Sequence, residues 1–367
     1  MTNNDQKVRL APTKPKGPIA WLACNLFNSP MSTLITLMMI LAIGALIIPL
    51  INWAVVNAVW TVAGNSIEDT AICRAESAGA CWAVIGEKYR FILFGLYPFD
   101  QQWRPALAIM LFLALLAGST DRRWWGMPIM IFWVVALGVI YLLMGGGSLG
   151  LSSVPENRWG GLPVTLLLTT FGIALAFPIA ILVALGRTSD NPSLRFVCML
   201  FVEVVRGVPL ISVLFMASVL FPLFMPEGME VSKLMRALLA ISMFIAAYLS
   251  EIIRGGLQTL GPGQKEAAAA LGLGYWHAVF LVQLPQALAA ALPPMVSLFI
   301  GLFKSTSLVM TIGIFDLLNA AKSAVAEPAW QGFGTEAYLF AAAIYFCFCF
   351  AMSRYGMHLE HKTYRGR

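Results

Sequence analysis

The run LPVTLLLTTFGIALAFPIAILVALG, residues 162–186, contains 25 residues and no charged side chain. At 1.5 Å per residue, a helix of this length spans about 38 Å. The hydrocarbon core of a bilayer is about 30 Å thick and needs roughly 20 such residues. The run therefore predicts a helix that crosses a membrane.

Seven other apolar runs have the same character. Together with the first, they occupy about 32–53, 105–119, 127–145, 162–186, 197–223, 237–253, 286–303 and 336–353. The second run is short, and the apolar stretch 91–98 offers it an earlier start. The stretch 308–318 is too short to cross, so we expect it to re-enter or lie flat. We predict an all-α membrane protein with about eight transmembrane helices.

The composition excludes most other classes of protein. Apolar residues make up 59% of the 367 residues and charged residues 11%, and the mean hydropathy is +0.79. Soluble domains average about 45–50% apolar residues and about 25% charged residues. This difference excludes a soluble enzyme, a disordered chain and a coiled coil. Too few charged residues are available to cover a soluble surface of this size. The net charge of +6 does not indicate a nucleic-acid partner, because Lys and Arg are scattered between apolar runs and do not form one basic face.

The scattered charges instead predict the orientation. With the N-terminus in the cytoplasm, fourteen Lys and Arg residues fall on the inner side, including Arg122 and Arg123, and nine fall on the outer side. Cytoplasmic loops of membrane proteins carry such an excess. Eight spans return the C-terminus to the cytoplasm as well.

The chain divides near residue 159. Residues 1–158 contain three spans and an outer, periplasmic loop at about 57–103, and Gly145–Gly150 begins a linker. Residues 159–353 contain five spans, and residues 354–367 form a basic tail. No internal repeat is evident.

The longest inner loop between spans contains a short helix-forming segment. The turn Gly261-Pro262-Gly263 precedes Gln264-Lys265-Glu266 and four alanines, and Gly272 and Gly274 end the segment. A short helix with small side chains suits a groove on a partner protein. On these properties alone, a surface helix that merely connects two spans fits equally well.

The spacing in this loop matches a known pattern. It has Glu266-Ala267-Ala268, three residues, Gly272, nine residues, and Val282-Gln283-Leu284-Pro285. This resembles the EAA loop of ABC importer permeases at every element. Further segments resemble the polar amino-acid members of that family: Leu162–Arg187, Arg206–Leu210 with a departure at Val208, Ala247–Gly256, Leu284–Leu288, and Lys304–Leu308 with Ser305 where Asp is common.

The resemblance covers about residues 159–355 and carries several implications. It implies a five-helix type I importer core, preceded here by a three-helix extension like that of the larger permease subunits of general L-amino-acid importers. It also implies that Glu266, Ala267, Ala268, Gly272, Leu284 and Pro285 dock onto an ATPase. The expected partners are an ATP-binding cassette ATPase dimer, a second permease subunit in a heterodimer, a periplasmic amino-acid-binding protein, the lipid bilayer and the amino-acid substrate.

No Walker A motif is present, so we expect ATP-Mg on the partner ATPase and no cofactor or catalytic residue on this chain. The expected location is the bacterial inner membrane. The short tail cluster His358, Glu360 and His361 lacks a third anchored ligand, so we predict no metal site.

Charges at membrane depth usually face a protein interior or a cavity. The candidate substrate path comprises Glu203, Arg206, Glu251, Lys304, Ser305, Thr306 and Ser307. Glu203 and Arg206 have the spacing of a helical ion pair. Lys304 follows a span that Pro293-Pro294 is expected to break. The alternatives are that residues 191–205 lie along the inner interface, with Pro209 starting a new helix, and that Glu251 and Lys304 mark ordinary helix boundaries.

Cys73 and Cys81 lie on the predicted oxidising side, and seven intervening residues allow a disulfide. Two free thiols are the alternative.

Two other functions compete with an importer subunit. An ion-coupled secondary carrier is expected to show two related halves, which this sequence lacks. A membrane scaffold leaves the loop pattern unexplained.

Overall fold

The computed structural model describes residues 17–365 except 121–125, 148–149, 227 and 229, and it describes side chains up to residue 360. The predictions for the N-terminal basic residues, for Arg122 and Arg123 and for the end of the basic tail, including His361, lie outside these limits. The chain forms two compact units, residues 1–82 and 83–367. Both units are mainly helical. The described residues form isolated β-bridges but no β-strand.

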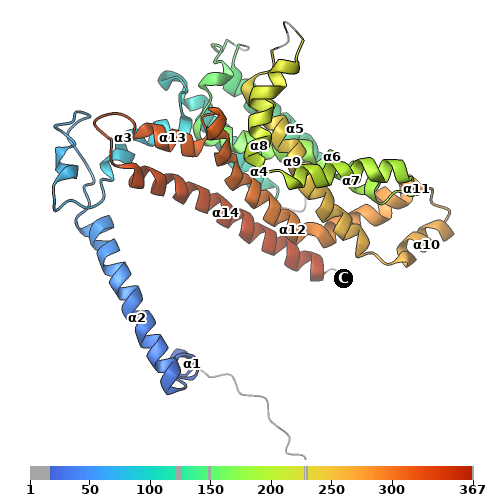
Figure 1. Ribbon diagram of the computed structural model, residues 1–367, viewed down its shortest axis with the longest axis horizontal. Coiled ribbons are helices and arrows are strands. Elements are labelled where there is room, and N and C mark those ends of the chain that lie inside the picture. Colours follow the sequence, from blue (N-terminus) through green and yellow to red (C-terminus); the bar gives the residue numbers. More distant parts are fainter. Residues whose placement is uncertain (1–16, 121–125, 148–149, 227, 229, 366–367) are drawn as a thin grey trace, which may run out of the picture. The chain divides into compact units, whose positions relative to one another are not determined.

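Unit 1 is built around one long apolar helix. Helix α1 spans Pro18–Leu26 and α2 spans Pro30–Ile51, which a π-helical turn extends to Val56 (Figure 1). The Ser29 side chain caps α2 by accepting a hydrogen bond from the Ser32 amide. No residue of α2 is buried within the structure, so the apolar surface of this helix is available to lipid or to other proteins.

The chain after α2 folds back on the end of that helix. Cys73, in the 3-10 turn Ala71–Arg74, forms a disulfide with Cys81, and their Cα atoms are 5.5 Å apart. The Ala80 amide donates to the Trp53 carbonyl at 2.7 Å, and the Val59 amide donates to the Ala80 carbonyl at 2.8 Å. The loop is therefore an ordered element anchored to the helix end.

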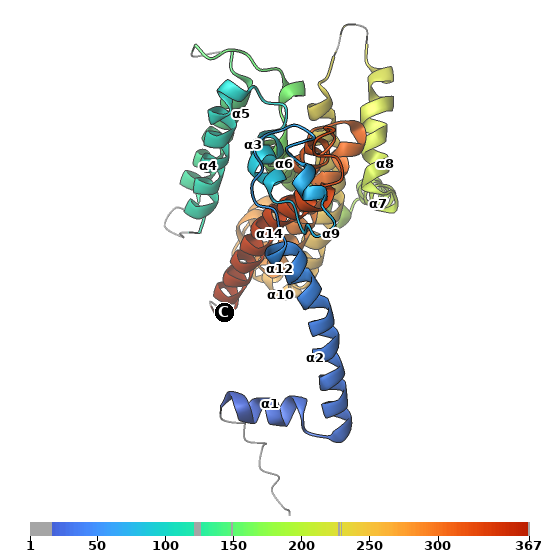
Figure 2. The same cartoon turned by 90° about the vertical axis from the view of Figure 1, so that its left-hand side faces the viewer.

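Unit 2 begins with α3 (Ala83–Phe94), α4 (Trp103–Gly118) and α5 (Met127–Gly145), and α4 and α5 lie side by side (Figure 2). Arg104 is buried, and its guanidinium donates to the carbonyls of Leu143 at 2.6 Å and Ser152 at 3.0 Å. It thus joins the ends of α4 and α5. Because α3 packs against α6 and α13, these helices belong to the same compact unit as the five-span region. The division near residue 159, between an extension and the transport core, stays a prediction about function.

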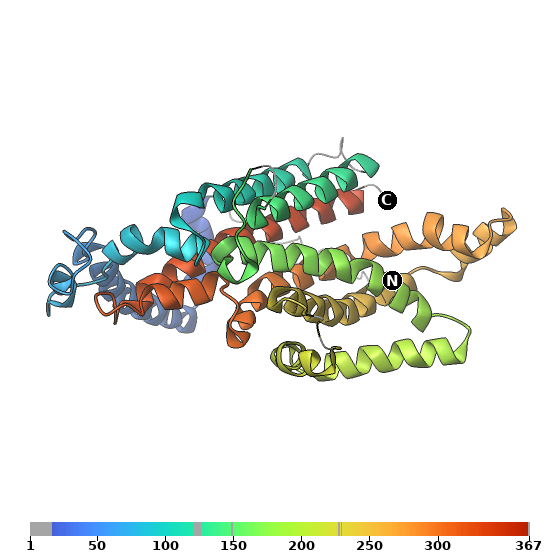
Figure 3. The ribbon, with the colours of Figure 1, turned by 90° about the horizontal axis from the view of Figure 1, so that it is seen from above.

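Three helices form the centre of unit 2: α6 (Gly161–Arg187), α9 (Lys233–Gln258) and α12 (Leu284–Ser305). Helix α9 packs against both of the others, and α6 and α9 run together in Figure 3. The buried face of α9 recurs every three to four residues, as at Ile241, Ile245, Leu249 and Ile253. Helix α13 (Leu317–Ala324) and α14 (Gly334–Arg365) pack against this centre.

The predicted single span 197–223 is wrong as a straight helix. The chain forms α7 (Pro192–Gly207) and α8 (Leu210–Phe215), and short π and 3-10 turns extend α8 to Phe224. The two parts are bent by 101° (Figure 2). Pro209 lacks an amide hydrogen, and it forces Val208 into an extended conformation, with φ −111° and ψ 135°. The alternative that a new helix starts at Pro209 is the observed arrangement.

Two details near α12 also differ from expectation. Helix α12 continues through Pro293 and Pro294 without a break, and the Ser297 hydroxyl donates to the Pro293 carbonyl. The stretch 308–318, predicted to re-enter or lie flat, is divided between two elements. Its first residues belong to the 3-10 helix Thr306–Ile312, which continues α12 up to Gly313, and its last two begin α13.

Within the described ranges, six helices are long and apolar enough to cross a membrane, and the bent α7–α8 pair makes seven. Helix α4, with 16 residues, is shorter than the 18 that define those spans. The eight predicted runs correspond in order to α2, α4, α5, α6, the α7–α8 pair, α9, α12 and α14.

Candidate functional site

The inner loop folds as a short exposed helix at one end of unit 2. Helix α10 spans Pro262–Ala270 and lies between α9 and the single turn α11, Tyr275–His277 (Figure 1). Pro262 suits the first turn, where its missing amide hydrogen is not needed. Ala268 is the only buried residue of α10, and Glu266 and Ala267 face outward. The helix therefore offers a narrow surface of small side chains.

The rest of the loop is anchored to α12. Gly272 adopts φ +75°, a left-handed conformation that favours glycine, and no other group lies within 4 Å of the place a Cβ would take. Leu284 begins α12 as a buried residue, and Pro285 is exposed in its first turn. The Gln286 side chain donates to Gln264 Oε1 at 3.1 Å, which links α12 to α10.

A cluster of four charged residues lies where α6 and α9 approach their C-terminal ends. The Glu251 carboxylate of α9 accepts hydrogen bonds from Arg187 of α6 and Arg254 of α9. Arg206 of α7 places Nη1 4.0 Å from Glu251 Oε2. The same Arg206 guanidinium lies 5.3 Å from the ring centroid of Tyr248 on α9. We call Arg187, Arg206, Glu251 and Arg254 the Glu251 cluster.

The expected pair between Glu203 and Arg206 is wrong. Arg206 faces Glu251, and the exposed Glu203 has no ion pair in the part of the chain that the structure describes. Both lie on α7, but α9 brings a second carboxylate within reach of Arg206. From the sequence, Arg187 is only one of the inner-side charges at the end of a span, and its position there does not indicate its partner.

Lys304 and the three hydroxyl residues after it have different surroundings. Lys304 is exposed and forms no ion pair among the described residues. Thr306 is fully buried and donates to the Phe303 carbonyl at 2.7 Å, whereas the Ser307 hydroxyl donates to the Lys304 carbonyl at 2.8 Å. Ser305 is half-buried at the end of α12. Lys304 is thus the member of this group with a charge free for another molecule.

Asp316 is a buried carboxylate that the sequence analysis did not single out. Its side chain caps α13 by accepting from the amides of Leu318 at 3.1 Å and Asn319 at 3.0 Å, and Tyr345 of α14 donates to it at 3.4 Å. Burial raises the pKa of Asp316 to about 6, and these hydrogen bonds oppose the increase. A sequence signal existed, because Asp before an apolar helical run is a common N-cap.

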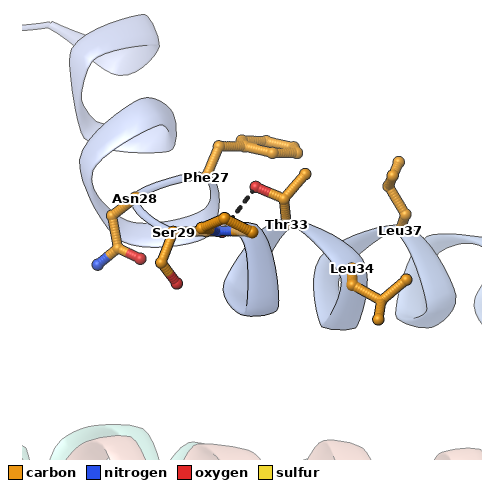
Figure 4. A pocket seen from close by; sticks show the side chains of 7 residues that line it. Phe27, Asn28, Ser29, Thr33, Leu34 and Leu37 are labelled. Carbon is orange, nitrogen blue, oxygen red and sulfur yellow. Dashed lines mark hydrogen bonds between the residues drawn. The ribbon is translucent and has the colours of Figure 1, made fainter.

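Two hollows among the described residues have contrasting linings. One, of about 580 Å³, lies at the α1–α2 turn, where the Thr33 hydroxyl donates to the Ser29 carbonyl (Figure 4). Its lining includes Phe27, Leu34 and Leu37 and no ionisable residue. The other, of about 290 Å³, is lined by Phe221, Pro222, Met225, Glu230, Val231 and Arg236. Only the second combines both signs of charge.

The model for binding-protein-dependent transport system inner membrane components matches residues 176–364. This chain belongs to that family. The match runs from the second half of α6 into α14, and it includes α10 and all four residues of the Glu251 cluster.

Full-length relatives narrow the family to amino-acid ABC transporter permeases. The permease is 46% identical over 354 residues to the inner membrane amino-acid ABC transporter permease protein YhdY of Escherichia coli (strain K12), covering 95% of this chain and 94% of the relative. It is 37% identical over 423 residues to the glutamate/glutamine/aspartate/asparagine transport system permease protein BztC of Rhodobacter capsulatus, covering 97% and 96%.

A shorter relative matches only part of the permease. The probable glutamine ABC transporter permease protein GlnP of Bacillus subtilis (strain 168) is 33% identical over 202 residues, which cover 55% of this chain and 91% of the relative. The predicted resemblance to importer permeases is therefore confirmed, and an ion-coupled carrier is excluded. The permease is a multi-pass protein of the bacterial inner membrane and a transport component, not itself a catalytic enzyme.

Proposed function

We propose that this chain is the larger permease subunit of an ATP-driven importer of polar L-amino acids. It works with an ATP-binding cassette ATPase dimer that binds ATP-Mg, a shorter second permease subunit and a periplasmic amino-acid-binding protein. The names of YhdY and BztC support the substrate class, because both relatives align along nearly the whole chain. The shorter GlnP supports a division between a shared core and an extension peculiar to the larger subunits.

The exposed helix α10 is the observation that carries this proposal. Its outward-facing Glu266 and Ala267, the left-handed Gly272, and the anchored Leu284 and Pro285 form a rigid projection for an ATPase groove. A helix that merely joined two spans would not require the spacing from Glu266 to Pro285. It would also not require a residue as small as Ala267 on its outer face.

The substrate path belongs, in this proposal, to the five-span core. An amino acid keeps its ammonium and carboxylate charges, so it needs partners of both signs when it leaves water. Arg206, with 37% of its side chain exposed, and the unpaired Lys304 are suited to the carboxylate. Glu203 is suited to the ammonium group. Ser305 and Ser307 supply lone pairs beside Lys304, whereas the buried Thr306 supports this end of α12 from within, and Glu251 fixes the Arg206 guanidinium.

A bulky residue on the docking surface tests the proposal. Gly272→Trp and Ala267→Trp should reduce amino-acid uptake and co-purification of the ATPase, while the permease still inserts. Ala267→Trp separates docking from backbone strain, because Ala267 lies on a regular helix. The matched control is Asp190→Trp, at an exposed position between α6 and α7. Normal uptake and ATPase association in both α10 variants would falsify the docking role.

A further inference from the structure

One carboxylate lies among three guanidinium groups on three different helices. Glu251 accepts hydrogen bonds from Arg187 and Arg254 through both of its oxygens, and Arg206 approaches to 4.0 Å. The side chains are between 11% and 37% exposed, so the cluster is partly withdrawn from water. Charge-assisted hydrogen bonds of this kind are stronger than neutral ones.

The charges make Glu251 indispensable to the cluster. Without its carboxylate, three cations from α6, α7 and α9 would face one another, partly buried, with no counter-charge among the described residues of the cluster. Removal of one partner from a buried ion pair destabilises far more than the pair itself contributes. The ionised Glu251 carboxylate is therefore what lets the three arginines of the cluster approach one another.

Two close contacts between helices lie at the same end of the unit, one with backbone and one with a side chain. A Cβ at Gly256 of α9 would meet the Ala287 carbonyl oxygen of α12 at 2.4 Å, and a Cβ at Gly186 of α6 would meet Cys198 Sγ of α7 at 2.5 Å. Because each pair of helices packs so closely, α9 moves with α12 and α6 moves with α7, and neither pair slides along its contact. Helix α10 begins four residues after α9 ends at Gln258, and Gln264 is linked to Gln286 of α12.

We infer that Glu251 is a positioning residue that makes the ends of α6, α7 and α9 one block, through which movement of α10 reaches the spans. The inference rests on the proposed function. Its geometry also argues against direct binding of the substrate ammonium group by Glu251, because arginines already occupy both carboxylate oxygens. Without the block, α10 could move with the ATPase while α6 and α7 keep their positions.

The test compares uptake with ATP hydrolysis in the full transporter, reconstituted in vesicles with its ATPase and binding protein. Glu251→Gln should leave insertion, assembly and basal ATP hydrolysis near wild type, and lower uptake per ATP hydrolysed by about tenfold, a size typical of lost coupling contacts. Glu251→Asp keeps the charge and should recover part of that ratio. The matched control, Asp190→Asn, removes an exposed carboxylate without a partner and should match wild type.

Arg187→Gln provides a second variant if Glu251→Gln fails to fold. It releases only α6 and should lower the same ratio by a smaller factor. An unchanged ratio of uptake to ATP hydrolysis in the folded variants would overturn the inference. If the KM for the amino acid is raised at that unchanged ratio, the cluster contacts the substrate instead. If the wild-type transporter itself hydrolyses ATP but takes up no amino acid, the proposed function fails instead.

Discussion

Helices α2 and α9 are both long enough to cross a membrane, yet they interact with their surroundings in opposite ways. Helix α2 has a mean hydropathy of 2.8 over its most apolar window, no charged residue and no buried residue. For α9 the hydropathy is 1.7, and the helix carries Lys233, Arg236, Glu251 and Arg254 and buries one face. The less apolar helix is the better packed one, because in a bilayer polar groups are sheltered by other helices and apolar groups by lipid.

The comparison indicates where function resides. A uniformly apolar helix such as α2 has no group that distinguishes one rotation from another, so it suits a lipid-facing or assembly role. Helix α9 places charges at both ends and small residues, such as Ala246 and Gly256, along its packed face. It therefore connects the hollow near Arg236 to the Glu251 cluster and to α10.

Matched glycine substitutions give the largest expected difference between the two helices. Gly256→Leu in α9 collides with the Ala287 backbone and should abolish folded, active transporter, since overpacking alone costs about 1–3 kcal/mol and backbone cannot yield like a side chain. Gly44→Leu in α2 meets nothing within 4 Å and should change stability by less than about 0.5 kcal/mol. Detergent-solubilised yield and melting temperature measure both. Equal losses for the two variants would contradict the contrast.

The next prediction separates the core from unit 1. Arg206→Ala and Lys304→Ala should each lower uptake about tenfold or more, since a hydrogen bond to a charged group is worth about 1.5–3 kcal/mol. Removal of residues 1–82 should preserve substrate preference, because unit 2 keeps all its internal contacts. Removal up to residue 145 would also strip α3 from α6 and α13. Competition assays with labelled amino acids measure preference. A changed preference in the truncated chain, with normal uptake by both alanine variants, would move the path out of the core.

A pH-dependent effect is expected from the buried Asp316 of unit 2. Its pKa is raised from 3.8 to about 6, so its contribution to folding stability is greatest below about pH 4 and is lost as pH rises through 6. The loss amounts to about 3 kcal/mol. Asp316→Asn keeps a capping oxygen and should remove this part of the pH dependence, giving a melting temperature at pH 7 equal to or above that of wild type. A parallel pH profile in the variant and wild type would sink this account.

The smallest effect on transport is expected at the outer loop of unit 1. Cys73→Ser with Cys81→Ser should cost unit 1 about 2–3 kcal/mol through its less restricted unfolded state, but should alter uptake less than about twofold. In the unreduced wild type, thiol reagents should label the exposed Cys24 and spare Cys73 and Cys81. Labelling of Cys73 and Cys81 without a reductant would show that the disulfide is absent in the membrane.

The sequence by itself determined the class of the protein and most of its helices. Apolar runs of bilayer length predict spans without knowledge of their neighbours, because a backbone in lipid must satisfy its own hydrogen bonds. The spacing from Glu266 to Pro285 likewise identifies the inner loop, since docking depends on residues close together in the chain. Asp316 was also within reach of sequence reasoning, as an N-cap.

Only the tertiary structure decided which charges meet. The i, i+3 spacing of Glu203 and Arg206 predicted a local pair, but Arg206 faces Glu251, 45 residues further along the chain. Arg187 reaches the same carboxylate from a third helix. The bend at Pro209 and the packing of α6 against α9 set these distances, and no local pattern encodes them. A carboxylate among several arginines is stabilised by whichever cations the folded helices bring within about 4 Å, because Coulomb attraction depends on distance in space and not on separation along the sequence.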